Sequence, residues 1–475
     1  MATLVLHQVR FRFATLSLTT WVVIGITGLA LTLRLWGIGA EPFNRDEVEE
    51  LWGALHPWKD IVNWSGNGTP TSLYLERLWM TVSPMSEAWL RLLPVLANIG
   101  GVLVGFVLGR RLFGLTGGVV VGGLLAVSPT QVYYAREVNE YGWLALMSGL
   151  ILLAAERVHE KPLDRDRWAL LGLAMAAALW VHVGTAFASV AAALTLLPTL
   201  RQRALWAGAG LGGVIGLVGG YILWTSLMAE KFANVGTYVH SFTGIGHLLD
   251  VAVYSVVIGG SGSFLMTGLM LGLVGTAAYL IASGRVPLSP ERKRAIVYAA
   301  IPWLLFIVAS QYGFYSFAGR YSLAIGLSSA LLVALCFTAL RLHFIAVIPL
   351  LLTLATLEGM EPAQAQWQAG MQSQMADFSA QVQPGHCILS RVEQPIFRSM
   401  MRWYTGPDVP QANIADTSLD GMMGQCEAVW VFASVFWDNE GFSQNAQQTY
   451  TLVRTVPAEK ALWNAQMTLA YQFTR

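Results

Sequence analysis

The chain has 475 residues, of which 55% are hydrophobic and only 12% carry a formal charge. Soluble proteins have about 25% charged residues, so this chain cannot cover itself with a water-facing surface. The composition excludes an ordinary soluble protein and predicts one that spans a lipid bilayer. A net charge of +1 also gives no support to nucleic-acid binding.

A helix needs about 20 apolar residues to cross the bilayer core. The sequence predicts eleven such spans, near residues 16–36, 87–109, 115–129, 138–157, 167–181, 183–199, 204–228, 262–283, 295–311, 321–340 and 343–358. Gly101, Gly105 and Gly109 form a small-residue ladder within the second span, which favours close packing between helices. The first stretch is too long for a cleavable signal and is expected to remain as a span.

Every second connection between these spans carries a basic group. The groups are Arg10/Arg12, Arg110/Arg111, Arg157/Lys161/Arg165/Arg167, Arg201/Arg203, Arg285/Arg292/Lys293/Arg294 and Arg341. Cytoplasmic loops collect Lys and Arg, so these connections are expected inside. The pattern predicts a multi-pass protein of the plasma (inner) membrane, with a cytoplasmic N-terminus. It also divides 167–199 into two spans at His182, because a single crossing would put Arg167 and Arg201 on opposite sides.

Residues 37–86 form a long loop on the predicted outer side. Val48, Leu51, Trp52 and Leu55 make one apolar stripe at helical spacing, and a second stripe consists of Leu75, Leu78, Trp79 and Val82. Such stripes predict helices that lie on the membrane surface. Thr69 and Pro70 suit the cap and first position of the second helix.

The composition changes near residue 359, where apolar runs shorten. Segments 386–390, 428–433, 449–456 and 467–473 read as short strands. The predicted fold is an all-α, polytopic membrane domain at 1–358, including the outer loop 37–86, followed by a small extracytoplasmic α/β domain at 359–475. Cys387 and Cys426 fall in that second domain, where an oxidising compartment permits a disulfide; two separate free thiols are the alternative.

The polar residues of interest all fall on the predicted outer side. Asp46 and Glu47 follow the first span, and Asn44 before them suits a helix cap, so a stabilised helix start is the alternative to a catalytic role. Tyr133, Glu137 and Tyr141 share one face if a single helix carries all three. The alternative for those three is a tyrosine belt at the interface.

Three more outer residues have both a functional and a structural explanation. His182 lies between two short apolar runs, and a lone histidine is more often a hydrogen-bonded interior residue than a ligand. Arg320, followed by Tyr321, stands at the mouth of a late span against the inside bias of arginine. Its guanidinium matches phosphate geometry, and snorkelling toward the interface is the alternative.

In their order and spacing, these motifs resemble the GT-C glycosyltransferases. The likeness is closest to the family that includes bacterial protein O-mannosyltransferase-like and aminoarabinose-transferase-like enzymes, a glycosyltransferase family 39-like group. It covers roughly residues 16–340: the Asp-Glu pair after the first span, the Tyr133 to Tyr141 segment, and Arg320-Tyr321.

The resemblance implies that a sugar passes, with inversion, from a polyprenyl-phosphate lipid donor to an acceptor outside the membrane. Asp46 then matches the aspartate at the catalytic centre, and Arg320 matches the arginine that approaches the lipid phosphate. Glu137 matches a residue that shapes the acceptor or metal site, and His182 a common outer histidine. Glu47, Tyr133, Arg136, Tyr141 and Tyr321 complete the expected substrate-binding set. Asp46 and Glu137 are the candidate ligands of a divalent metal cation, although the sequence lacks a dense acidic cluster.

The chain departs from the family pattern at two points. Thr69 to Tyr74 replaces an element that often contains Pro-Pro, and Asn139 stands where the family often has arginine. Both departures touch the expected pocket. They keep open a second hypothesis, a catalytically silent GT-C-like subunit that binds lipid or a partner complex. A transporter is disfavoured, because no pair of broken helices repeats across two halves.

Overall fold

The structure is a computed structural model, and it divides into two compact units. It describes residues 17–39, 43, 45–61, 70–202, 210, 213–214, 217, 264–311, 319–343, 378–390, 409–413, 418–432, 446–457 and 468–474. The first unit comprises Met1–Ile38, Pro57–Ser83 and Leu90–Met360, and the second Gly39–His56, Pro84–Trp89 and Glu361–Arg475. Parts of the 37–86 loop therefore belong with the C-terminal region, a grouping that local composition does not reveal.

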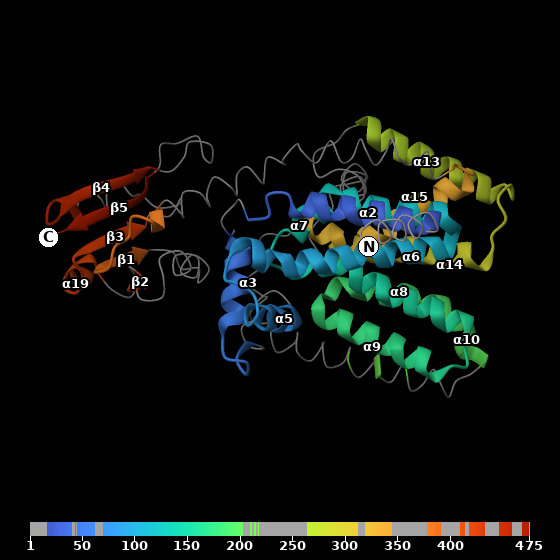
Figure 1. Ribbon diagram of the computed structural model, residues 1–475, viewed down its shortest axis with the longest axis horizontal. Helices are drawn as coiled ribbons and strands as arrows, with labels where there is room; N and C mark the ends of the chain where they lie inside the picture. The colour runs from blue at the N-terminus through green and yellow to red at the C-terminus, as the bar shows by residue number, and fades with distance from the viewer. Residues whose placement is uncertain are drawn as a thin grey trace, which may run out of the picture. The chain divides into compact units, whose positions relative to one another are not determined.

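The first unit is helical. Its helices are α2 (Leu18–Leu35), α5 (Pro70–Met80), most of α6 (Glu87–Val127), α7 (Pro129–Ala135), η1 (Glu140–Trp143), α8 (Leu144–Glu160), α9 (Arg165–Val181), η2 (Val183–Thr185), α10 (Ala186–Gln202), α13 (Phe264–Ala282), α14 (Pro290–Gln311) and α15 (Gly319–Ala339). Helix α8 packs on α9, α10 and α15, and α14 packs on α10 and α15 (Figure 1).

Nine of the eleven predicted spans coincide with described helices, and the predicted spans 204–228 and 343–358 fall largely or wholly outside the described residues. Among the described helices, four are long and apolar enough to cross a membrane by themselves. The break at His182 is confirmed: α9 ends at Val181 and α10 begins at Ala186.

Helix α6 turns back on itself at Gly114, whose φ of 75° lies in the left-handed region that favours glycine. The two arms of α6 match the predicted spans 87–109 and 115–129. A Cβ placed on Gly109 would lie 2.5 Å from the carbonyl oxygen of Gly117, and one on Gly101 would lie 2.8 Å from the backbone nitrogen of Leu146. The glycine ladder therefore does pack helices closely, as predicted.

Helix α5 begins at Pro70, as expected for proline at the first helical position. It buries Ser72, Leu73 and Glu76, whereas Leu78 of its apolar stripe is 53% exposed. A helix with an exposed apolar stripe and a partly polar buried face is suited to lie at a lipid surface.

Basic groups from distant parts of the chain meet at one end of the helices. Arg111 of α6 contacts Glu156 of α8, and Arg294 of α14 contacts the same carboxylate. Val286, next to Arg285, shares a small apolar cluster with Ala339, near Arg341. We call this the arginine end. The opposite end, where α7, η1 and His182 lie, we call the tyrosine end.

The second unit contains α3 (Arg45–Leu55) and a five-stranded sheet. The strands are β1 (His386–Ser390), β2 (Gln411–Asn413), β3 (Ala428–Phe432), β4 (Thr451–Pro457) and β5 (Thr468–Thr474), in the order β2-β1-β3-β5-β4. Strands β2, β1 and β3 run parallel, and β5 is antiparallel to both β3 and β4 (Figure 1). The four predicted strands are confirmed, and β2 is an addition.

The predicted disulfide is present in this unit. Cys387 on β1 and Cys426 before β3 are bonded, with their Cα atoms 5.9 Å apart. Leu419, Met422 and Met423 of helix α19 (Leu419–Met423) join these cysteines in one buried apolar cluster with Val429 and Phe473. The bridge therefore closes a small core that local hydrophobicity alone would support weakly.

Candidate functional site

Five of the expected site residues lie at the tyrosine end of the first unit: Tyr133, Arg136, Glu137, Tyr141 and His182. Tyr134 on α7 contacts Tyr141 on η1, with ring centroids 5.7 Å apart, and Tyr141 contacts His182 at 5.3 Å. Tyr133 packs edge-on against Tyr134 at 4.9 Å. The aromatic chain therefore joins three segments of the fold, and Tyr134 is the member that sequence spacing did not select.

No single helix carries Tyr133, Glu137 and Tyr141, so the condition under which they would share one face is not met. Helix α7 ends at Ala135, and a short 3-10 helix begins only at Glu140. Between them Asn139 adopts an extended conformation and caps the new helix: its side-chain oxygen accepts a hydrogen bond of 3.0 Å from the Tyr141 backbone N–H. A local capping interaction thus overrides the helical period.

Asn139 also fixes the side chain of Glu137. Its amide nitrogen donates a hydrogen bond of 2.9 Å to the Glu137 carboxylate. Glu137 is buried, as is Asn139, while Arg136 is half-buried. The residue that departs from the family pattern therefore has a defined task here, because it holds the carboxylate and begins the helix that carries Tyr141.

His182 is held at the break between α9 and α10. Its Nδ1 accepts a hydrogen bond of 2.9 Å from the Gly184 backbone N–H, so the neutral ring carries its proton on Nε2. The hydroxyl of Thr185 donates to the His182 carbonyl at 2.8 Å. Burial lowers the pKa of His182 from 6.5 to about 4, so the ring is neutral near pH 7.

The remaining expected site residues belong to two other helices, α3 and α15. Asp46 and Glu47 occupy the first turn of α3 in the second unit; Glu47 is buried and Asp46 is half-buried. Arg320 and Tyr321 belong to the first turn of α15, and their side chains lie outside the described residues, as does Asn44. Each unit is described by itself, so the convergence of Asp46, Glu137 and Arg320 stays a prediction.

No group of three His, Cys, Asp or Glu side chains within the described ranges is placed to hold a metal ion. Asp46 and Glu137, the candidate ligands, belong to separate units. Two carboxylates alone make a weak site for a divalent cation, which prefers six or more oxygen ligands. A divalent cation bound between Asp46 and Glu137 therefore stays a prediction.

A second buried polar cluster lies at the arginine end, and sequence reasoning did not single it out. The carboxylate of Glu156 accepts hydrogen bonds from Nε and Nη2 of Arg294, at 2.7 and 2.9 Å, and from the Tyr298 hydroxyl at 3.0 Å. Arg111 completes the contacts, and Glu156 is 1% exposed. In the sequence, the feature that could have pointed to this cluster is an acidic residue inside an apolar helix.

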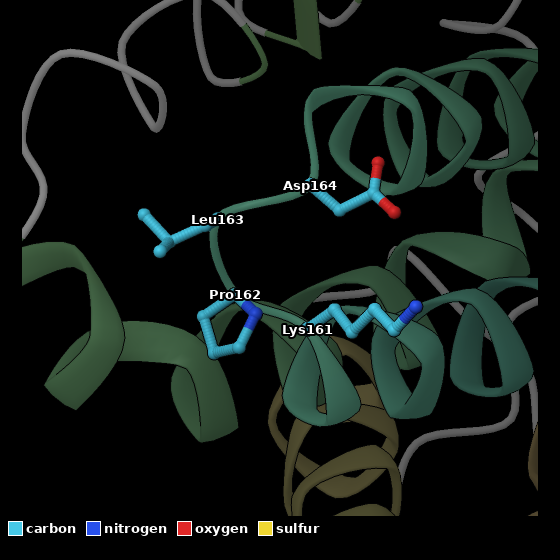
Figure 2. A pocket seen from close by; sticks show the side chains of 4 residues that line it. All are labelled: Lys161, Pro162, Leu163 and Asp164. Atoms are coloured by element: carbon cyan, nitrogen blue, oxygen red, sulfur yellow. The ribbon is translucent and has the colours of Figure 1, made fainter.

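A shallow surface hollow opens at the same end, lined by Lys161, Pro162, Leu163 and Asp164 in the connection between α8 and α9 (Figure 2). His182 stands at the far end of α9, which at 1.5 Å per residue is about 25 Å away. The hollow is therefore not part of the tyrosine-end site.

No family model matches the chain, and no curated protein matches its sequence. Solved structures do match. ArnT from Cupriavidus metallidurans, in the apo state and bound to undecaprenyl phosphate, superposes with a TM-score of 0.61 and 13% identity, over 96% of this chain and 98% of that one.

A second similar structure is the archaeal oligosaccharyltransferase AglB from Archaeoglobus fulgidus, in complex with an inhibitory peptide and a dolichol-phosphate. Its TM-score is 0.51 at 13% identity, over 87% of this chain and 69% of that one. Both proteins are GT-C glycosyltransferases. The chain has the GT-C fold. The structural similarity extends over nearly the whole chain, beyond the segments that carried the resemblance.

Proposed function

We propose that the protein is a GT-C glycosyltransferase that moves a sugar from a polyprenyl-phosphate carrier to an acceptor on the outer side of the membrane. The observation that carries the proposal is the match to ArnT over almost the full length of both chains. That structure contains undecaprenyl phosphate, and the AglB structure contains dolichol-phosphate. Two carriers of the same chemical class in one fold favour a polyprenyl-phosphate donor here.

The tyrosine end is the proposed location of the transfer. It lies opposite the basic groups that are expected in the cytoplasm, so it would face outward together with the C-terminal unit. Activity reporters fused after residue 370 test this orientation. They should be active in the exterior compartment, and cytoplasmic activity would refute it.

In the proposed reaction, Asp46 accepts the proton of the acceptor hydroxyl while the hydroxyl oxygen attacks the anomeric carbon. The bond between that carbon and the phosphate oxygen breaks, and its electron pair leaves with the lipid phosphate. Arg320 stabilises the charge that develops there. In-line attack inverts the anomeric centre. Glu137, Tyr141 and His182 would shape the acceptor side of the pocket, and a divalent cation would require Asp46 and Glu137 to meet.

The test is transfer of label from a panel of undecaprenyl-phosphate-linked radiolabelled sugars by the full chain in nanodiscs. Asp46→Asn should lower transfer by about 100-fold or more, because it keeps shape but removes the base. Asp166→Asn is the matched control, since Asp166 also lies in the first turn of a helix, at the arginine end. It should transfer normally.

Two results would contradict the proposal. Equal transfer by Asp46→Asn and the wild type would remove Asp46 from catalysis. Binding of undecaprenyl phosphate in native mass spectrometry, with no transfer of any sugar in the panel, would favour the silent GT-C-like subunit. The Asn139 departure is the observation that makes this second outcome worth measuring.

A further inference from the structure

Arg34, at the end of the first span, is completely buried and binds groups far away in the sequence. Its Nη1 donates to the Ala126 carbonyl at 2.8 Å, and its Nη2 to the Leu125 carbonyl at 2.9 Å. These are among the last carbonyls of α6, which have no partner within their own helix. A cation at a helix C-terminus also interacts favourably with the helix dipole. Arg34 therefore fixes the end of α6, from which α7 departs after one residue.

Asn98, on the first arm of α6, extends this contact toward the site. Its side-chain oxygen accepts a hydrogen bond of 2.9 Å from Arg34 Nε, and its amide nitrogen donates to Gln131 on α7 at 3.0 Å. The same nitrogen lies 3.3 Å from the Gly142 carbonyl of η1, where it also donates. Asn98 and Gln131 are each 1% exposed, so no bulk water competes with these bonds.

The two segments that Asn98 joins are those that carry the aromatic chain. Tyr133 and Tyr134 precede the break on α7, and Tyr141 follows it on η1. The intervening residues 136–139 have no regular helix to hold them. Gly142 also packs closely, since a Cβ placed there would lie 3.0 Å from Cβ of Pro94, one helical turn before Asn98.

We propose that Arg34 and Asn98 are positioning residues for the tyrosine-end site. Arg34 sets the orientation of Asn98, and Asn98 holds α7 and η1 at the separation that places Tyr141 beside His182. Their role in sugar transfer rests on the proposed function. Their role in ordering residues 136–143 does not, and it is measured without substrate.

The experiment is hydrogen exchange of the full chain in nanodiscs, followed by mass spectrometry. Asn98→Asp keeps the acceptor for Arg34 but loses the donor to Gly142. It should speed exchange of the amides in 136–143 about tenfold, as expected when one or two hydrogen bonds that hold a segment are lost. Exchange in residues 150–160 of α8 should not change. Asn98→Ala, which introduces no new charge, is measured beside it, so that the test stands when one variant does not fold.

Thr195→Val is the matched control. It removes a half-buried side-chain contact between Thr195 and His159 at the arginine end, and it should leave hydrogen exchange at 136–143 unchanged. Unaltered exchange at 136–143 in the Asn98 variants, or an equal increase along the whole bundle, would overturn the proposal.

Transfer supplies the second readout. In an active protein, Asn98→Asp should lower kcat about tenfold and leave KM for the lipid-linked donor unchanged, since the donor phosphate is assigned to Arg320. Loosened exchange with normal kcat would overturn the positioning role. A wild-type protein with no transfer would refute the proposed function alone, and the exchange result would still decide whether Asn98 orders the segment.

Discussion

At the arginine end of the bundle, the buried carboxylate of Glu156 is clamped by Arg294, Arg111 and the Tyr298 hydroxyl. At the tyrosine end, the buried carboxylate of Glu137 accepts a hydrogen bond from the neutral amide of Asn139. The first arrangement joins three helices through charge-assisted bonds, the strongest that side chains make. The second joins residues two positions apart, so it orients the carboxylate but does little to hold the bundle together.

The two ends of the helical bundle differ in the groups that hold their buried acids. The Glu156 carboxylate is bound by two arginines and a tyrosine hydroxyl, and its loss would leave buried positive charge behind. Glu137 is held by the neutral amide of Asn139, in the segment that also carries Tyr141. Burial alone does not distinguish them, since Glu156 is 1% and Glu137 8% exposed. The partners do.

Removing the charge at the arginine end should give the largest change in stability. Glu156→Gln leaves Arg111 and Arg294 without their shared carboxylate, and it should lower the free energy of unfolding by about 3–5 kcal/mol. Denaturant titration in nanodiscs measures this. Transfer per folded molecule should be unchanged. Glu160→Gln is the matched control: Glu160 is 45% exposed, and its ion pairs should contribute less than about 1 kcal/mol.

The same substitution at the tyrosine end should have the opposite profile. Glu137→Gln should lower sugar transfer about 100-fold and the free energy of unfolding by only about 1 kcal/mol. Initial transfer rates and denaturant titrations on the same preparations test both numbers. If Glu137→Gln destabilises as strongly as Glu156→Gln, the division between the ends is wrong.

Tyr298→Phe tests the arginine end with a smaller change. It removes the hydroxyl that donates to Glu156 and keeps the ring, so the free energy of unfolding should fall by about 2 kcal/mol. Because Tyr298 lies at the arginine end, the pH profile and KM of transfer should match the wild type. A changed KM would show that the ionic cluster acts on the site.

A further expected effect concerns pH at the tyrosine end. The pKa of His182 is lowered from 6.5 to about 4, so an unfolded chain binds this proton more readily than the folded one. Stability is therefore full above pH 6.5 and is lost as the pH falls from 6.5 toward 4, by about 1 kcal/mol per pH unit. His182→Asn retains a side-chain acceptor for Gly184 and does not titrate. Thermal unfolding of this variant should fall less between pH 6.5 and 4.5 than that of the wild type; parallel curves would contradict the assignment.

Several features of this chain could be predicted because they depend on neighbouring residues alone. Apolar length located the described spans, proline placed the start of α5, and alternating patterns found four strands. Loop charge divided the chain at His182, and the two tail cysteines do pair. Two residues of the expected site, Tyr141 and His182, meet although they are 41 residues apart in sequence. The convergence of Asp46, Glu137 and Arg320 stays a prediction.

Other features were decided only by tertiary structure, since they depend on groups that the sequence separates widely. The helical period placed Tyr133, Glu137 and Tyr141 on one face, but the cap supplied by Asn139 and the packing of Gly142 against Pro94 start a new helix instead. Glu156 meets Arg294 across 138 residues of sequence, and Arg34 meets the end of α6 across 91 and 92. Local sequence therefore determined the membrane class and the course of the chain, because hydropathy and loop charge act residue by residue. Which groups surround each buried acid was decided by tertiary structure, because those partners come from distant parts of the chain.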